Sequence, residues 1–156
     1  MWFFYIAVGL FCLLVVVQFL RTWQKKSSDY ASVANAVHET KDKYSFLIDR
    51  EFNVKETNFY ELNENIRDDQ PYVLGNVIHC QVACDAGLCG TGIACNDCPL
   101  RMVLKNGFKM KRNFSDIAAK MQLYDANHDI QEVNVKVDGQ FTYIGDEPHF
   151  IVNVTK

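Results

Sequence analysis

The sequence contains an apolar run over residues 2–20 that carries no charged side chain and is interrupted only by Gly9 and Gln18. As a helix that rises about 1.5 Å per residue, this run would span roughly 28 Å, close to the hydrocarbon thickness of a bilayer. A cleaved signal peptide would have a basic start and a small-residue cleavage site, and this run has neither. We therefore expect a retained transmembrane anchor over residues 1–22.

Basic residues flank only one end of this run, at Arg21, Lys25 and Lys26. By the positive-inside rule we expect a single-pass protein of the inner or plasma membrane whose C-terminal domain is cytoplasmic. Five of the six cysteines fall in that domain, while Cys12 lies in the apolar run. Since the cytoplasm is reducing, a framework of disulfides does not account for these cysteines.

A linker helix is expected over residues 23–44, between the anchor and the domain. Ser27 or Ser28 can cap its helical part at residues 27–44, and a thin apolar stripe follows at helical spacing. The stripe consists of Tyr30, Val33, Ala34, Val37 and Tyr44. A stripe this narrow suits a pairing helix between membrane and domain better than a core helix, and a solvated spacer is the alternative.

The chain has 156 residues, enough for one small domain and an appendage but too few for a multidomain enzyme. Its 16 basic and 19 acidic residues give a formal net charge of −3. This balance lacks the basic surface that nucleic-acid binding requires, so no nucleic-acid partner is expected.

Residues 45–156 show the apolar patterning of an antiparallel α+β domain. We expect strands at 45–49, 52–57, 130–137 and 149–154, with one or two more within 108–124, and helices at 58–66 and 99–106. The second helix is expected to stop at Gly107, and Asp138-Gly139 is expected to form a tight turn. The predicted fold is a five-stranded antiparallel sheet with short helices on one face.

The domain contains a cysteine cluster with the spacing C-x3-C-x4-C-x5-C-x2-C. Cys95 and Cys98 form its C-x2-C pair, at a turn into the helix that Pro99 begins. Two thiolates at this spacing can converge on one metal ion, and a helix N-terminus favours the thiolate form. Cys80 and Cys89 would complete a four-cysteine site, with Cys84 or His79 as substitutes. Such a site suits zinc or an iron–sulfur cluster.

Three hypotheses for these cysteines remain open at this point. They bind a metal or an iron–sulfur centre; or Cys95 or Cys98, with a lowered pKa, forms a disulfide on oxidation; or they are small buried side chains without reactivity. The C-x2-C pair has no second C-x2-C pair to match it, which departs from the layout of structural zinc ribbons.

Several segments resemble a PAS domain. Residues 46–49 (FLID) and 52–54 (FNV) resemble the first hairpin of that family, Asn58 falls where the family usually carries an asparagine, and residues 150–155 (FIVNVT) resemble its last strand. Residues 75–80 (GNVIHC), 89–90 (CG) and 95–101 (CNDCPLR) resemble a cysteine-bearing subgroup of bacterial PAS sensors on membrane-linked histidine kinases. Cys84 is an addition to that pattern.

The resemblance implies a PAS-type sensory module over residues 45–156. It also implies that this module forms a homodimer or pairs with another PAS protein or a histidine kinase. The sequence stops at Lys156, where such a sensor normally passes its signal to an output module, so we expect no enzymatic activity. The predicted function is membrane-anchored signal transduction, with a cysteine-rich loop that binds a metal or iron–sulfur centre or responds to redox state. The alternative is a non-sensing structural domain for protein interaction, with a zinc-stapled or metal-free loop.

Overall fold

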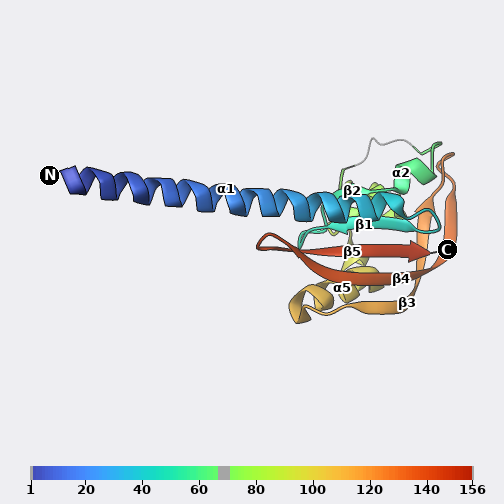
Figure 1. The fold of residues 1–156 in the computed structure, drawn as a ribbon. Helices are drawn as coiled ribbons and strands as arrows, with labels where there is room; N and C mark the ends of the chain where they lie inside the picture. Colours follow the sequence, from blue (N-terminus) through green and yellow to red (C-terminus); the bar gives the residue numbers. More distant parts are fainter. Residues whose placement is uncertain (1, 67–70, 156) are drawn as a thin grey trace.

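The structure is a computed structural model that describes residues 2–66 and 71–155, with the side chains of residues 2–8 outside the described part. A long helix precedes two strands, a group of short helices, a longer helix and three further strands (Figure 1). In chain order these are α1 Trp2–Glu39, β1 Tyr44–Ile48, β2 Val54–Thr57, α2 Phe59–Leu62, α3 Leu74–Val77, α4 Gln81–Asp85, the 3₁₀ helix η1 Ile93–Asp97, α5 Pro99–Met110, β3 Phe114–Tyr124, β4 Ile130–Ile144 and β5 Glu147–Thr155.

The five strands form one antiparallel sheet in the order β2-β1-β5-β4-β3. The main core lies between this sheet and the helices of the middle segment, and it includes Phe46, Val152, Leu74 and Leu104. The predicted α+β fold with a five-stranded antiparallel sheet is therefore confirmed. Each strand appears near its predicted position, and so does helix α5, which was predicted at residues 99–106.

Strand β1 is buried on both of its faces, which explains the continuous apolar sequence of residues 46–48. Phe46 and Ile48 point into the main core, whereas Leu47 packs in a separate small cluster on the opposite face of the sheet. That cluster also contains Val37 of α1 and Ile144 of β4. The second buried face exists because α1 covers it.

Helix α1 is continuous from Trp2 to Glu39, so the predicted linker at residues 23–44 is the second half of one helix. Its C-terminal part lies along the sheet, while its N-terminal part extends away from the domain (Figure 1). The stripe expected to suit a pairing helix packs on the sheet instead: Val37 is fully buried, and Tyr30 and Val33 pack around it. The helix also ends earlier than predicted, because Tyr44 already belongs to β1.

The predicted anchor at residues 1–22 falls partly on residues 1–8, whose side chains are outside the described part. Within the described part of the chain, none of the helices has the length and apolar character needed to cross a bilayer.

Two predicted chain breaks are wrong. Strand β4 continues through Asp138 and Gly139, and the hairpin turn comes after Ile144 instead. Gly139 is required by packing, since a Cβ atom there would collide with the ring of Phe114. Helix α5 likewise continues past Gly107 to Met110, and Lys111 at its C-cap has a left-handed φ of 52°.

Candidate functional site

A cavity of about 330 Å³ lies between strand β3 and the segment that runs from α3 to the start of α5. Its wall contains all four cysteines predicted as the primary ligands, Cys80, Cys89, Cys95 and Cys98. Apolar side chains of the core, among them Phe52, Leu74, Leu100 and Leu104, form much of the remaining wall. The fold thus brings together cysteines that lie up to 18 positions apart in the sequence, Cys80 and Cys98.

The backbone around each cysteine fixes where its side chain starts. Cys80 occupies the N-cap position of α4, and its N–H donates to the Gly75 carbonyl at 2.8 Å. Its backbone also forms an isolated antiparallel β-bridge with Leu123 of β3. Cys98 occupies the N-cap position of α5, and Cys95 is buried in η1. The Cys95 sulfur accepts a hydrogen bond from the backbone N–H of Gly90 at 3.4 Å.

Asn76 is a buried side chain that holds the cysteine loop and that the sequence analysis did not single out. Its Oδ1 accepts the N–H of Cys89 at 2.7 Å, and its Nδ2 donates to the carbonyl of Gly87 at 3.3 Å. The side chain is fully buried, so these bonds form without competition from bulk water. Its only sequence signal was its place inside the GNVIHC segment of the PAS resemblance.

Arg101 places a positive charge beside the pocket. Its Nη1 lies 3.9 Å from the sulfur of Cys89, and its guanidinium carbon lies 4.8 Å from the centre of the Phe52 ring. Gly90 has a φ of +98° and packs against this guanidinium so closely that a Cβ atom would collide with it. A thiolate at Cys89 would therefore be partly neutralised by Arg101.

Burial raises the pKa of the Cys80 thiol, and the nearby thiols of Cys98 and Cys95 act in the same direction. Burial also raises the pKa of the Cys89 thiol, and this outweighs the opposite influences of a backbone hydrogen bond and Arg101. Both groups are consequently neutral thiols near pH 7. Any ligand that needs thiolates must displace their protons.

The two predicted substitute ligands lie elsewhere. Cys84 is in α4, close to Tyr124, whose hydroxyl donates to Asp85 at 2.8 Å. His79 is buried and stacks on Phe59 with a centroid separation of 6.5 Å. Among the described residues that line the cavity, neither Cys84 nor His79 is present.

The donor set of four sulfurs has the chemistry of a zinc or iron–sulfur site. As the side chains are placed, however, no three or more His, Cys, Asp or Glu residues of the described chain are grouped closely enough to hold a metal ion. No disulfide joins the cysteines of the described chain. The arrangement is a thiol-lined apolar pocket, and metal binding there would require the side chains to draw together.

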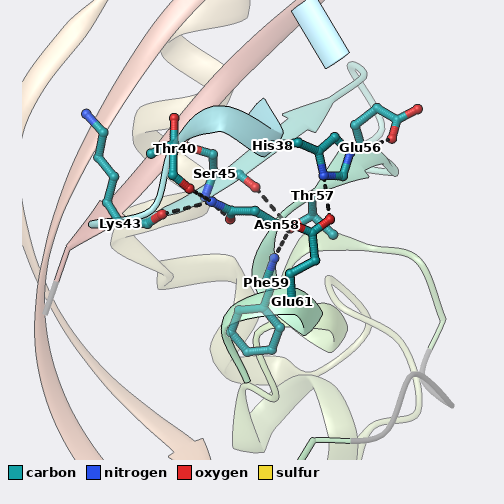
Figure 2. A network of polar contacts seen from close by, with 9 residues as sticks. All are labelled: His38, Thr40, Lys43, Ser45, Glu56, Thr57, Asn58, Phe59 and Glu61. Carbon is teal, nitrogen blue, oxygen red and sulfur yellow. Dashed lines mark hydrogen bonds and ion pairs between the residues drawn. The ribbon is translucent and has the colours of Figure 1, made fainter. Parts of the chain in front are cut away.

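A second polar site joins α1 to the outer side of the sheet (Figure 2). His38 lies between two carboxylates: its Nδ1 is 2.6 Å from Glu61 Oε1 and its Nε2 is 3.3 Å from Glu56 Oε2. Because carboxylates only accept hydrogen bonds, both contacts require a protonated ring. Burial disfavours that charged form, but the hydrogen bonds to Glu56 and Glu61 prevail and raise the pKa of His38.

Glu56 also contacts Tyr30, which lies eight residues, or about two helical turns, before His38 in α1. The Tyr30 hydroxyl donates to Glu56 Oε1 at 2.5 Å. Burial, together with the Glu56 carboxylate, raises the pKa of Tyr30 to about 12. The hydroxyl therefore remains protonated and keeps donating over the whole physiological pH range.

Asn58 connects the end of α1 to the start of the sheet (Figure 2). Its Oδ1 accepts the N–H of Ser45 at 2.8 Å, and its Nδ2 donates to the carbonyls of Thr40 and Lys43. This buried amide holds the short connection between helix and strand. Asn58, the asparagine noted in the PAS resemblance, thus has a structural role: it stabilises the connection between α1 and β1.

No model of a known protein family matches this sequence, and no curated protein matches it either. Two solved structures are similar in fold. One is a PAS domain from Desulfitobacterium hafniense, with 13% identity and a TM-score of 0.46, covering 76% of this chain and 95% of that one. The other is a PAS domain from a two-component sensor histidine kinase, with 11% identity and a TM-score of 0.42, covering 82% and 96%.

Proposed function

We propose that this chain is a membrane-anchored sensory module of PAS type, and that the cysteine-lined pocket is its sensing site. The observation that carries the proposal is the convergence of Cys80, Cys89, Cys95 and Cys98 on one apolar cavity. The four residues come from the start of α4, the following loop, η1 and the start of α5. Chance burial of inert cysteines gives no reason for such a convergence.

The anchoring part of the proposal rests on the apolar run at residues 2–20. Large apolar side chains of α1 are exposed all along its described portion in this region, including Phe11, Leu14 and Phe19. Exposed apolar surface of this extent is unfavourable in water and favourable in lipid. With basic residues only at its C-terminal end, the run would leave the domain in the cytoplasm of a single-pass protein.

The signal would pass through the sheet. The pocket touches β3 at residues 119–122, while α1 packs on the other face against Leu47 and Ile144. A change that frees the cysteine loop from β3 would alter the support of the sheet under α1. We propose that α1 transmits this change to a second copy of the chain, or to another PAS or histidine-kinase protein, with no catalysis by this domain.

The ligand of the pocket would be a metal or an iron–sulfur centre, or the thiols would respond directly to oxidation. Binding of a soft metal must displace protons from Cys80 and Cys89, because burial raises the pKa of both thiols. We therefore expect binding to release protons. Metal affinity should rise between pH 6 and pH 8, by about ten-fold per pH unit for each proton released. Isothermal titration with Cd²⁺ in two buffers of different ionisation enthalpy measures both effects.

Anaerobic purification of the full chain in detergent, with metal analysis and an absorption spectrum, tests the proposal. A visible charge-transfer band with bound iron supports the iron–sulfur sensor, while reactive thiols without metal support the redox sensor. Stoichiometric zinc that survives oxidant and reductant unchanged would favour the non-sensing structural domain.

Matched variants test the ligands. Cys95→Ser with Cys98→Ser should abolish metal occupancy or thiol reactivity, whereas Cys84→Ser, which lies outside the cavity wall, should leave both unchanged. If the double variant retains its metal or its redox response, the assignment of the sensing site is wrong.

A further inference from the structure

The hairpin turn between β4 and β5 lies directly beside the membrane-proximal part of α1. A Cβ atom on Gly145 would lie 3.2 Å from Cδ of Lys26, and the Lys26 ammonium pairs with Glu147 at 3.2 Å. Lys26 comes six positions after Leu20, the end of the apolar run, which corresponds to about 9 Å along a helix. The polar layer on each side of the hydrocarbon is roughly 5–8 Å thick. A membrane-embedded α1 thus brings Lys26 and this turn to the outer edge of the headgroup layer.

The C-terminal end of α5 lies beside the same turn. The Lys111 ammonium is 5.6 Å from the centre of the Tyr143 ring, and Asn113 Oδ1 accepts the N–H of Phe141 at 2.8 Å. Figure 1 shows the end of α5 and the β4–β5 turn on the side of the domain from which α1 projects. Both segments therefore face the membrane when α1 is inserted.

The end of α5 is basic although the chain as a whole is acidic, while the neighbouring β4–β5 turn carries Asp146 and Glu147, of which Glu147 is paired with Lys26. Residues 99–115 contain five basic side chains and no acidic one, against a net charge of −3 for the chain. Within the described part of the chain, no ion pair involves Lys105, Lys109, Lys111 or Arg112, and all four are exposed. Met110 and Tyr143 are exposed beside them, by 57% and 45%. Acidic side chains of the opposite end, such as Glu64 and Asp129, lie near α2 and the β3–β4 turn.

We propose that this surface docks on the anionic headgroups of the bilayer that holds α1. The membrane-facing surface consists of Lys105, Lys109, Met110, Lys111, Arg112 and Tyr143. Its unpaired cations complement anionic phosphate groups, and its exposed thioether and phenol suit the boundary between headgroups and acyl chains. The inference rests on the proposed membrane anchoring, and it adds a second attachment that fixes the orientation of the domain.

The test uses the full chain in vesicles of phosphatidylcholine alone and in vesicles with added phosphatidylglycerol. Hydrogen exchange over residues 105–113 should be slower in the anionic vesicles by about five-fold for each basic side chain that reaches the surface. High salt should remove the difference, since screening shortens the range of these charges.

Charge-reversal variants provide the matched comparison. Lys109→Glu with Arg112→Glu should abolish the difference between the two lipids. Lys41→Glu with Lys136→Glu makes the same change in charge at exposed positions away from this surface and should preserve it.

Flotation of the vesicles separates the two claims. A chain that floats with both lipids but exchanges equally in both overturns the docking and leaves the anchor intact. A chain that does not float with either overturns the anchor and, with it, the docking. A lipid difference that survives the Lys109 and Arg112 reversals also overturns the docking surface as assigned.

Discussion

The cysteine-lined pocket and the α1 junction lie on opposite faces of one sheet and are held by different kinds of contact. The pocket is closed by backbone hydrogen bonds to a buried amide, Asn76, and by apolar side chains. The junction is held by a small apolar cluster around Val37 and by partly exposed charged groups around His38. A buried amide is costly to disrupt, whereas partly exposed ion pairs contribute little each.

The difference suggests a division of roles. Under the proposed function, the pocket side would keep one conformation until a chemical change reaches its thiols. The α1 side is held weakly enough for a modest change in the sheet to shift the helix, because a few contacts of about 0.5–1 kcal/mol each can be rearranged together. Perturbing the two sides separately should therefore give effects of different size and kind.

The largest effect is expected from Asn76→Ala. The substitution leaves the buried N–H of Cys89 and the carbonyl of Gly87 without their partner, and should lower the free energy of unfolding by about 3 kcal/mol. Denaturant titration measures this, and hydrogen exchange should show the loss concentrated at residues 84–95. Asn106→Ala, at an exposed position of α5, should change stability by less than about 0.5 kcal/mol. Equal effects of the two substitutions would contradict the role given to Asn76.

A smaller effect is expected from Val37→Ala. Val37 is fully buried against Leu47 and Ile144, so truncation should weaken the docking of α1 by about 2 kcal/mol. Faster hydrogen exchange over residues 30–39, with little change at residues 84–95, would confirm that the junction loosens independently of the pocket. Ser32→Ala, on the exposed side of the same helix, is the control. Loosening of the cysteine loop to the same degree would show that the two sides do not differ as described.

The smallest effect concerns pH. Folding raises the pKa of His38 above its ordinary value of about 6.5, so its stabilisation is complete below that pH and is lost as pH rises through the raised pKa. His38 is partly exposed, and we expect a change of only about 0.5 kcal/mol. Exchange over residues 30–39 should accelerate with pH, after correction for intrinsic rates, more than in His38→Gln. His128→Gln, in the exposed β3–β4 turn, should keep the dependence of the parent chain.

The sequence predicted the strands well because their apolar patterns reflect burial in the sheet. The predicted turn at Asp138-Gly139 was wrong because Gly139 is required by close packing against the ring of Phe114. Local turn preferences carry no information about such a tertiary contact. The predicted helix stop at Gly107 was wrong for the same reason. Gly107 lies within α5, and its missing side chain leaves room for the ring of Phe150. A glycine required for close packing and a glycine required for a turn look alike in the sequence.

The site was predictable in part. The C-x2-C pair was the clearest sequence signal, and Cys80 and Cys89 were expected to complete the set with Cys84 or His79 as substitutes; the cavity wall contains the first four. Asn76, Arg101 and the His38 network were not predictable, since their partners lie in segments that only the folded chain brings near. Long-range polar contacts of this kind leave no periodic signal.

The most direct test of the account is a map of cysteine proximity in the folded full chain. Treatment of the reduced, folded chain with a short bis-maleimide, in the absence of competing small thiols, joins neighbouring cysteines through two thioether bonds, and peptide mapping then shows which sulfurs lie near one another. The account predicts links among Cys80, Cys89, Cys95 and Cys98 within one molecule, with Cys84 modified singly. Links that join Cys84 to these cysteines as often as they join one another, or links that form only after unfolding, would contradict a common pocket.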